Sequence, residues 1–308
     1  MKTEPKTEGK WKMFKNSLVA VGQTTRGLFK NWSGLSVLHL LYAALLASVY
    51  LFFSTKEATL WQLTLTASLA LLAPLLFFIL QAAAANFAQG DAGALALLRR
   101  ALADFFKLLL VSLPLVALAV LVVYLLNKLQ AYFPARVEDA AAASRVPYPQ
   151  TPPPPPMRWQ DVLLTSLRLV LLGVLLPLVA IQLWLSVARD GLKATLKRAH
   201  RVVGRAFAPQ PIFVYAIGLL VFGLMPYFLI FTRTPVKNSW GELIIFGLRL
   251  ALAFVFTLWG WLITLGALAK INADAQTGAT PGTSTTNVTH DSTPTTHHRE
   301  GLPAESAS

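Results

Sequence analysis

Six long apolar stretches dominate the sequence and limit the folds that the chain can adopt. They cover residues 35–53, 60–85, 108–126, 162–188, 212–231 and 243–269. A bilayer core about 30 Å thick takes about 20 apolar residues in a helix, and each stretch meets or nearly meets that length. Because every backbone polar group must be satisfied inside the membrane, the stretches predict an all-α integral membrane protein with six transmembrane helices.

The composition agrees with this interpretation and argues against a soluble enzyme. Hydrophobic residues make up 55% of the 308 residues and charged residues only 13%, about half of the roughly 25% found in soluble domains. The chain has no cysteine, which excludes disulfides, thiolate nucleophiles and metal sites that use cysteine ligands.

The basic residues predict the orientation of the spans. Loops on one side carry 17 Lys and Arg residues, whereas loops on the other side carry seven. Positive loops stay in the cytoplasm, so both termini are expected to be cytoplasmic. An even number of spans agrees with this orientation.

Two stretches of the sequence resemble each other at a constant spacing. The matching positions, each pair 81 residues apart, are Trp159 and Trp240, Asp161 and Glu242, Arg168 and Arg249, and Arg189 and Lys270. Trp61 and Gln62 open the second span in a similar way, but no acid follows them and Ala70 stands at the arginine position. The pattern indicates an internal repeat.

A basic segment precedes each span that is expected to run outward. In residues 95–109 apolar side chains recur every three or four positions, at Leu95, Leu98, Leu102, Phe105 and Leu109. Such spacing predicts an amphipathic helix lying at the membrane surface. The cations expected at the inner leaflet are Arg99, Arg100, Lys193, Lys197, Arg198, Arg201 and Arg205. They could bind anionic lipids or only set the topology.

These features predict three repeats, each an interfacial amphipathic helix followed by two spans. Residues 1–34 form a cytoplasmic segment with the first basic helix, and residues 35–271 form the transmembrane domain. An outer loop, 128–158, is rich in proline, and residues 272–308 are expected to be a disordered cytoplasmic tail because they are polar and poor in apolar residues.

Arg168 and Arg249 are the sharpest candidates for a binding site. Each lies seven residues after an acid, Asp161 or Glu242, which is two turns and about 10 Å along a helix. An arginine inside a span is costly unless it pairs, reaches the interface or faces a cavity. The pair could therefore bind an anionic headgroup or solute, or could simply pair with the acids and reach the outer interface.

Three other polar residues lie within spans. His39 is expected to be a hydrogen-bonded structural residue rather than a proton relay, and Gln81 and Gln182 are expected to join helices. We find no catalytic motif and predict no enzyme activity, cofactor, metal site or nucleic-acid partner.

The layout, with basic helices such as Leu192–Phe207 and Leu95–Phe106 leading into the spans, resembles bacterial six-span membrane families of unknown activity. It is also similar to the membrane domain attached to some glycerophosphodiester phosphodiesterases. The resemblance implies a location in the bacterial inner membrane and a supporting or lipid-related role.

The leading hypothesis is a scaffold or accessory protein that contacts inner-leaflet lipid. The alternative is a transporter or lipid-handling protein with an anion site near Arg168 and Arg249. Protein partners remain unidentified.

Overall fold

The computed structural model describes residues 7–55, 59–90, 93–132, 159–232 and 239–277, and all regular elements in these ranges are helices. Six of them are long and apolar enough to cross a membrane. They are α2 (Trp32–Ser54), α3 (Leu60–Phe87), α4 (Ala94–Ala131), the run Trp159–Asp190, the run Pro209–Phe231 and α12 (Ser239–Thr277). The predicted all-α, multi-pass architecture with six apolar helices is confirmed.

Two of the spans are interrupted by a π-helical segment. The run Trp159–Asp190 consists of α6 (Trp159–Arg168), the π-helix η1 (Leu169–Leu175) and α7 (Leu176–Asp190); the run Pro209–Phe231 consists of α10 (Pro209–Leu219), the π-helix η2 (Leu220–Leu224) and α11 (Met225–Phe231). Both π-helices end just before a proline, Pro177 or Pro226. A proline cannot donate the helical hydrogen bond to the residue four positions earlier, and wider turns accommodate its ring.

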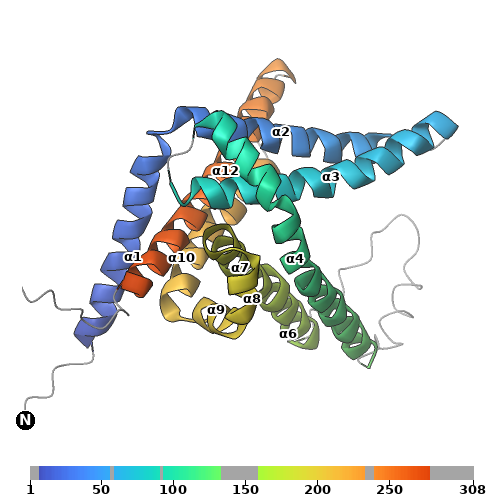
Figure 1. Cartoon of the computed structure of the whole chain (residues 1–308). Helices are drawn as coiled ribbons and strands as arrows, with labels where there is room; N and C mark the ends of the chain where they lie inside the picture. Colours follow the sequence, from blue (N-terminus) through green and yellow to red (C-terminus); the bar gives the residue numbers. More distant parts are fainter. Residues whose placement is uncertain (1–6, 56–58, 91–92, 133–158, 233–238, 278–308) are drawn as a thin grey trace, which may run out of the picture.

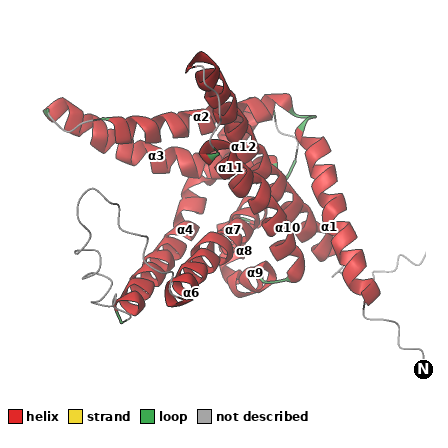
Figure 2. Ribbon diagram, turned by 180° about the vertical axis from the view of Figure 1, so that it is seen from behind, coloured by secondary structure: helices red, strands yellow, loops and turns green. Residues whose placement is uncertain are grey.

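The spans form three helical hairpins that point in different directions from a common centre (Figures 1 and 2). The first hairpin pairs α2 with α3, the second pairs α4 with α6 and α7, and the third pairs α10 and α11 with α12. In Figure 1 their tips point right, lower right and up. We call the opposite ends, which lie together, the convergent end.

The buried core lies towards the convergent end. Every residue of α3 from Ile79 to Asn86 is buried, as is every residue of α7 from Ala180 to Val187 and of α12 from Thr264 to Leu268. By contrast, large apolar side chains near the hairpin tips are exposed, including Phe53, Trp61 and Phe231. Exposed apolar side chains of this kind are suited to contact with lipid.

Three shorter helices join the convergent end. They are α1 (Thr7–Leu28), α8 (Leu192–Lys197) and α9 (Ala199–Ala206). Helix α1 lies along the C-terminal part of α12 (Figure 1), with Ala20 and Leu28 buried. The sequence predicts an amphipathic helix here, and the structure gives this helix protein partners in α12 and α10.

The basic segments before the later outward spans take two different forms. The segment at 95–107 runs directly into its span, because α4 continues without a break from Ala94 to Ala131. Its buried face is Leu97, Ala101, Phe105 and Leu108, whereas Leu95 is 82% exposed. The segment at 192–207 is divided at Arg198 into α8 and α9.

The first residues of the predicted tail are helical, since α12 continues through residues 272–277. The rest of the tail and most of the proline-rich loop, residues 133–158, lie outside the described residues.

Candidate functional site

Polar side chains join each hairpin to the other two. Two bonds connect the first and third hairpins: Trp259 Nε1 donates to His39 Nε2 (3.1 Å), and Trp261 Nε1 donates to Gln81 Oε1 (3.0 Å). Two connect the first and second: Asn86 donates to Asp104 (3.1 Å), and Gln89 donates to the carbonyl of Leu185 (3.1 Å). Two connect the second and third: Asn272 donates to Gln182 (2.6 Å), and Tyr215 donates to the carbonyl of Gly173 (2.9 Å).

These bonds test the predictions for the isolated polar residues. Gln81 and Gln182 each bond across hairpins, which confirms their assignment as interhelical contacts. Both ring nitrogens of His39 are occupied, since Nδ1 lies 2.8 Å from the carbonyl oxygen of Leu35 and Nε2 accepts from Trp259. The hydrogen bonding predicted for His39 is confirmed.

A pocket of about 530 Å³ lies at the convergent end between α1, the end of α3, the end of α7 and α12. We call it the basic pocket. Two cations, Arg189 and Lys270, line it together with Gln23 and Gln89, and Lys270 bonds to Gln23. No carboxylate is among its described lining residues. The pocket therefore combines positive charge with amide groups at its polar side.

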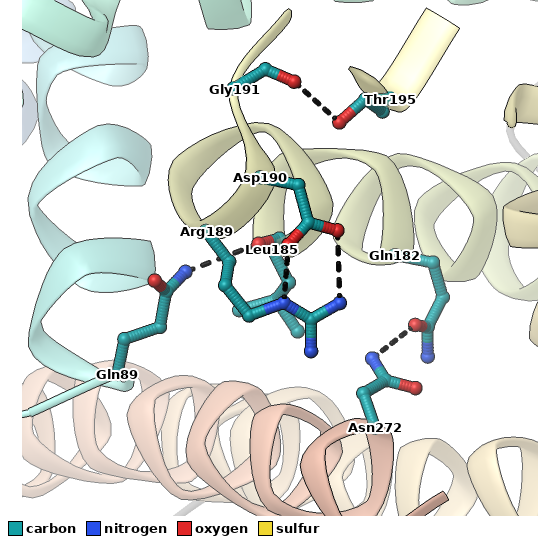
Figure 3. Close-up of polar contacts among 8 residues, drawn as sticks. All are labelled: Gln89, Gln182, Leu185, Arg189, Asp190, Gly191, Thr195 and Asn272. Atoms are coloured by element: carbon teal, nitrogen blue, oxygen red, sulfur yellow. Dashed lines mark hydrogen bonds and ion pairs between the residues drawn. The ribbon is translucent and has the colours of Figure 1, made fainter. Parts of the chain in front are cut away.

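Arg189 is held by its neighbour in the chain (Figure 3). Its Nε and Nη2 bond to the two carboxylate oxygens of Asp190, at 2.9 and 3.1 Å. Gly191 follows with φ of +79° and ψ of 168°, a combination that is essentially restricted to glycine. This residue ends α7, and its carbonyl accepts from Thr195 in α8 (2.9 Å). The sharp turn thus fixes Arg189 and Asp190 at the exit of the span.

Two amides flank Arg189. Figure 3 shows its guanidinium between Gln89, which reaches the carbonyl of Leu185, and Asn272, which reaches Gln182. Gln89, Arg189 and Asn272 also line one small cavity together. Gln182 is 1% exposed, and its amide nitrogen has no hydrogen-bond partner among the described residues. The bonded pair of Gln182 from α7 and Asn272 from α12 thus lies next to Arg189 and continues the polar side of the basic pocket.

A second cavity, of about 460 Å³, lies between all three hairpins. Its walls are almost entirely apolar, and include Phe77, Val116 and Leu176. The polar groups at its edge are mostly engaged with one another: Trp261 bonds to Gln81, and Trp184 bonds to Ser112 (2.8 Å). This apolar cavity offers contacts to hydrocarbon and few free polar groups.

The structure places Arg168 and Arg249 in different hairpins. Arg168 donates to Asn127 of α4 (2.8 Å), and Arg249 donates to the carbonyl of Thr232 after α11. Neither arginine lines the basic pocket or the apolar cavity. Asp161 and Glu242 are exposed near the hairpin tips, and the described ion pairs, Lys107 with Asp104 and Arg189 with Asp190, include neither acid. The two repeat-related arginines are therefore not brought together.

The seven cations expected at the inner leaflet are all exposed. They are Arg99, Arg100, Lys193, Lys197, Arg198, Arg201 and Arg205. They lie in the first turns of α4, in α8 and α9, and, for Arg198, between α8 and α9. Helix α9 packs against α7 and α10. All seven thus belong to the convergent end, where the basic pocket also lies.

Sequence reasoning missed the basic pocket, although one signal pointed to it. Arg189 and Lys270 share the spacing of 81 residues that singled out Arg168 and Arg249. No pattern in the sequence indicated that Gln23 and Gln89 would line this pocket. Within the described part of the chain, no three His, Asp or Glu side chains are grouped so that they could hold a metal ion. Comparison with models of protein families, with curated proteins and with solved structures found no match.

Proposed function

We propose that this multi-pass membrane protein is a scaffold or accessory protein of the bacterial inner membrane, without catalytic activity, whose convergent end lies against the anionic inner leaflet. The observation that carries the proposal is that seven exposed cations lie in the first turns of α4 and in the segment formed by α8, Arg198 and α9, all at the ends of spans opposite the hairpin tips. Each Lys or Arg near an anionic surface contributes about 1 kcal/mol of attraction.

The positions of the cations support this orientation. The loops at this end of the spans carry 17 Lys and Arg residues, whereas the loops at the other end carry seven. Basic loops remain cytoplasmic during insertion, so the convergent end faces the cytoplasm in this proposal. The bacterial location also agrees with the resemblance to six-span bacterial membrane families.

The test removes three of these charges from one helix. The variant R198Q/R201Q/R205Q should bind liposomes rich in phosphatidylglycerol on the order of a hundredfold more weakly than the unaltered protein at low salt, because it removes three such contributions, while binding to phosphatidylcholine liposomes stays the same. The matched control neutralises Lys56, Lys128 and Lys237, which the sequence assigns to the opposite side. Equal binding by both variants would contradict the proposal.

A second candidate is a protein that handles lipid within the membrane. The observation that favours it is the apolar cavity of about 460 Å³ among the three hairpins, a volume within the usual range of about 300–1,000 Å³ for ligand sites. The separation of Arg168 from Arg249 argues against an anion site shared by them. A transport role at those arginines predicts that R168A or R249A abolishes substrate uptake without loss of folding.

A further inference from the structure

We propose that the basic pocket binds the phosphodiester headgroup of one anionic phospholipid. This goes beyond the proposed function, which requires only a diffuse attraction between exposed cations and the membrane surface. The basic pocket is instead a defined site, enclosed by α1, α3, α7 and α12, that accepts a single lipid molecule.

The charge of the pocket suits a phosphodiester. Arg189 and Lys270 reach it from two different spans, and its described lining residues include no acid. Arginine and lysine are the usual partners of phosphate oxygens, because charge-assisted hydrogen bonds are shorter and stronger than neutral ones. The amides of Gln23 and Gln89 line the same pocket and can donate to the remaining oxygens.

Asp190 prepares Arg189 for this role and also restrains it. The carboxylate engages Nε and Nη2 of the guanidinium, which leaves Nη1 for a ligand. The pairing fixes the orientation of the guanidinium but offsets part of its charge. Removing the negative charge of Asp190 should therefore strengthen the attraction of the pocket for an anion.

The rest of the pocket points to a lipid rather than a soluble anion. Leu28, Phe87 and Leu262 line the same pocket as the two cations, so that a water-soluble phosphate would leave this apolar wall in water. The pocket also lies where α3, α7 and α12 emerge from the predicted membrane core. An amphiphile can place its charged group against Arg189 and Lys270 and its hydrocarbon against the apolar wall.

The experiment measures lipid binding to the full-length protein in detergent by native mass spectrometry, with phosphatidylglycerol and phosphatidylcholine as the probes. One phosphatidylglycerol molecule should bind with clear preference over phosphatidylcholine. The variants R189Q and K270Q should each weaken phosphatidylglycerol binding about fivefold, which corresponds to about 1 kcal/mol for each cation. D190N should strengthen it by about two- to fivefold, an effect that misfolding cannot produce.

The matched control is R26A, since Arg26 lies on α1 but outside the pocket. Equal weakening by R26A and R189Q would show general electrostatic attraction and overturn the proposal, as would unchanged affinity in R189Q, K270Q and D190N. Displacement of the lipid by millimolar glycerol 3-phosphate would show a soluble-anion site instead.

The variant R198Q/R201Q/R205Q separates this proposal from the proposed function. If the variant loses liposome binding but keeps the single bound lipid, both proposals hold. If it keeps both, only the proposed role of the surface cations fails.

Discussion

Arg189 and Lys270 line one pocket although they lie 81 residues apart. Arg168 and Arg249 have the same spacing but lie in separate hairpins. The difference follows from the arrangement of the helices, since the hairpins meet where α7 and α12 end and diverge towards α6 and the start of α12 (Figure 1). Matching positions in a sequence thus become neighbours only at the convergent end.

The hydrogen bond from Tyr215 in α10 to the carbonyl of Gly173 in η1 should stabilise the contact between the second and third hairpins. Pro177 cannot donate to the Gly173 carbonyl, and the hydroxyl of Tyr215 does so instead. Y215F should lower the free energy of unfolding by about 1–2 kcal/mol, measured by circular dichroism in mixed micelles of dodecyl maltoside and SDS. In the background P177A, where residue 177 regains its N–H, the same change should cost less. An equal cost in both backgrounds would refute this explanation.

The bond between Trp261 and Gln81 should contribute measurable coupling between the first and third hairpins. Gln81 is buried, so W261F leaves its carbonyl oxygen without this donor. We expect W261F to cost about 1 kcal/mol, and to cost less when Gln81 is already leucine. W61F serves as the control because Trp61 is exposed at a hairpin tip, and it should change stability by less than about 0.5 kcal/mol. Additive effects of W261F and Q81L would contradict the predicted coupling.

The contact between α1 and α12 should depend on the absence of a side chain at Gly266. A Cβ there would overlap Cγ2 of Thr24, so G266A should destabilise the protein by about 1–3 kcal/mol. T24S removes this methyl group and keeps the hydroxyl that bonds to Ala20, and should restore stability to G266A. The control on the same helix is G247A, since a Cβ at Gly247 meets no atom within 4 Å. Thermal unfolding midpoints that fall equally for G266A and G247A would exclude the predicted clash.

The predicted orientation can be tested with single cysteines, since the chain contains none. A membrane-impermeant maleimide should label S54C and T232C, which lie at hairpin tips, in intact spheroplasts. It should label G204C in α9 only after the membrane is permeabilised. Labelling of G204C in intact spheroplasts would place the convergent end outside the cytoplasm.

Much of the fold could be predicted because apolar length alone identifies spans. The sequence does not show where a basic helix ends and a span begins, since α4 continues from Ala94 through both. The π-helices were also not predicted. Gly173 with Pro177, and Gly223 with Pro226, mark where they occur, but a proline in a span can equally produce a kink or a wider turn.

The candidate site was only partly predictable. Gln81, Gln182 and His39 were recognised because a polar group in a span requires a partner, but their partners depend on how the hairpins pack. Arg168 could be recognised as a candidate because an arginine within a span is costly. Arg189 lies at the end of a span, where a charge is common, and only the approach of α1 and α12 encloses it in a pocket.

The docking of α1 on α12 has a consequence for the order of synthesis. Gln23 and Lys270 are in contact across 247 residues, so α1 must wait at the membrane until α12 has been inserted. Until then, the face of α1 that carries Ala20 and Leu28 lacks its contacts with α12. The basic pocket between them is therefore completed only when α12 leaves the insertion machinery, and a chain that stops short of α12 would lack it.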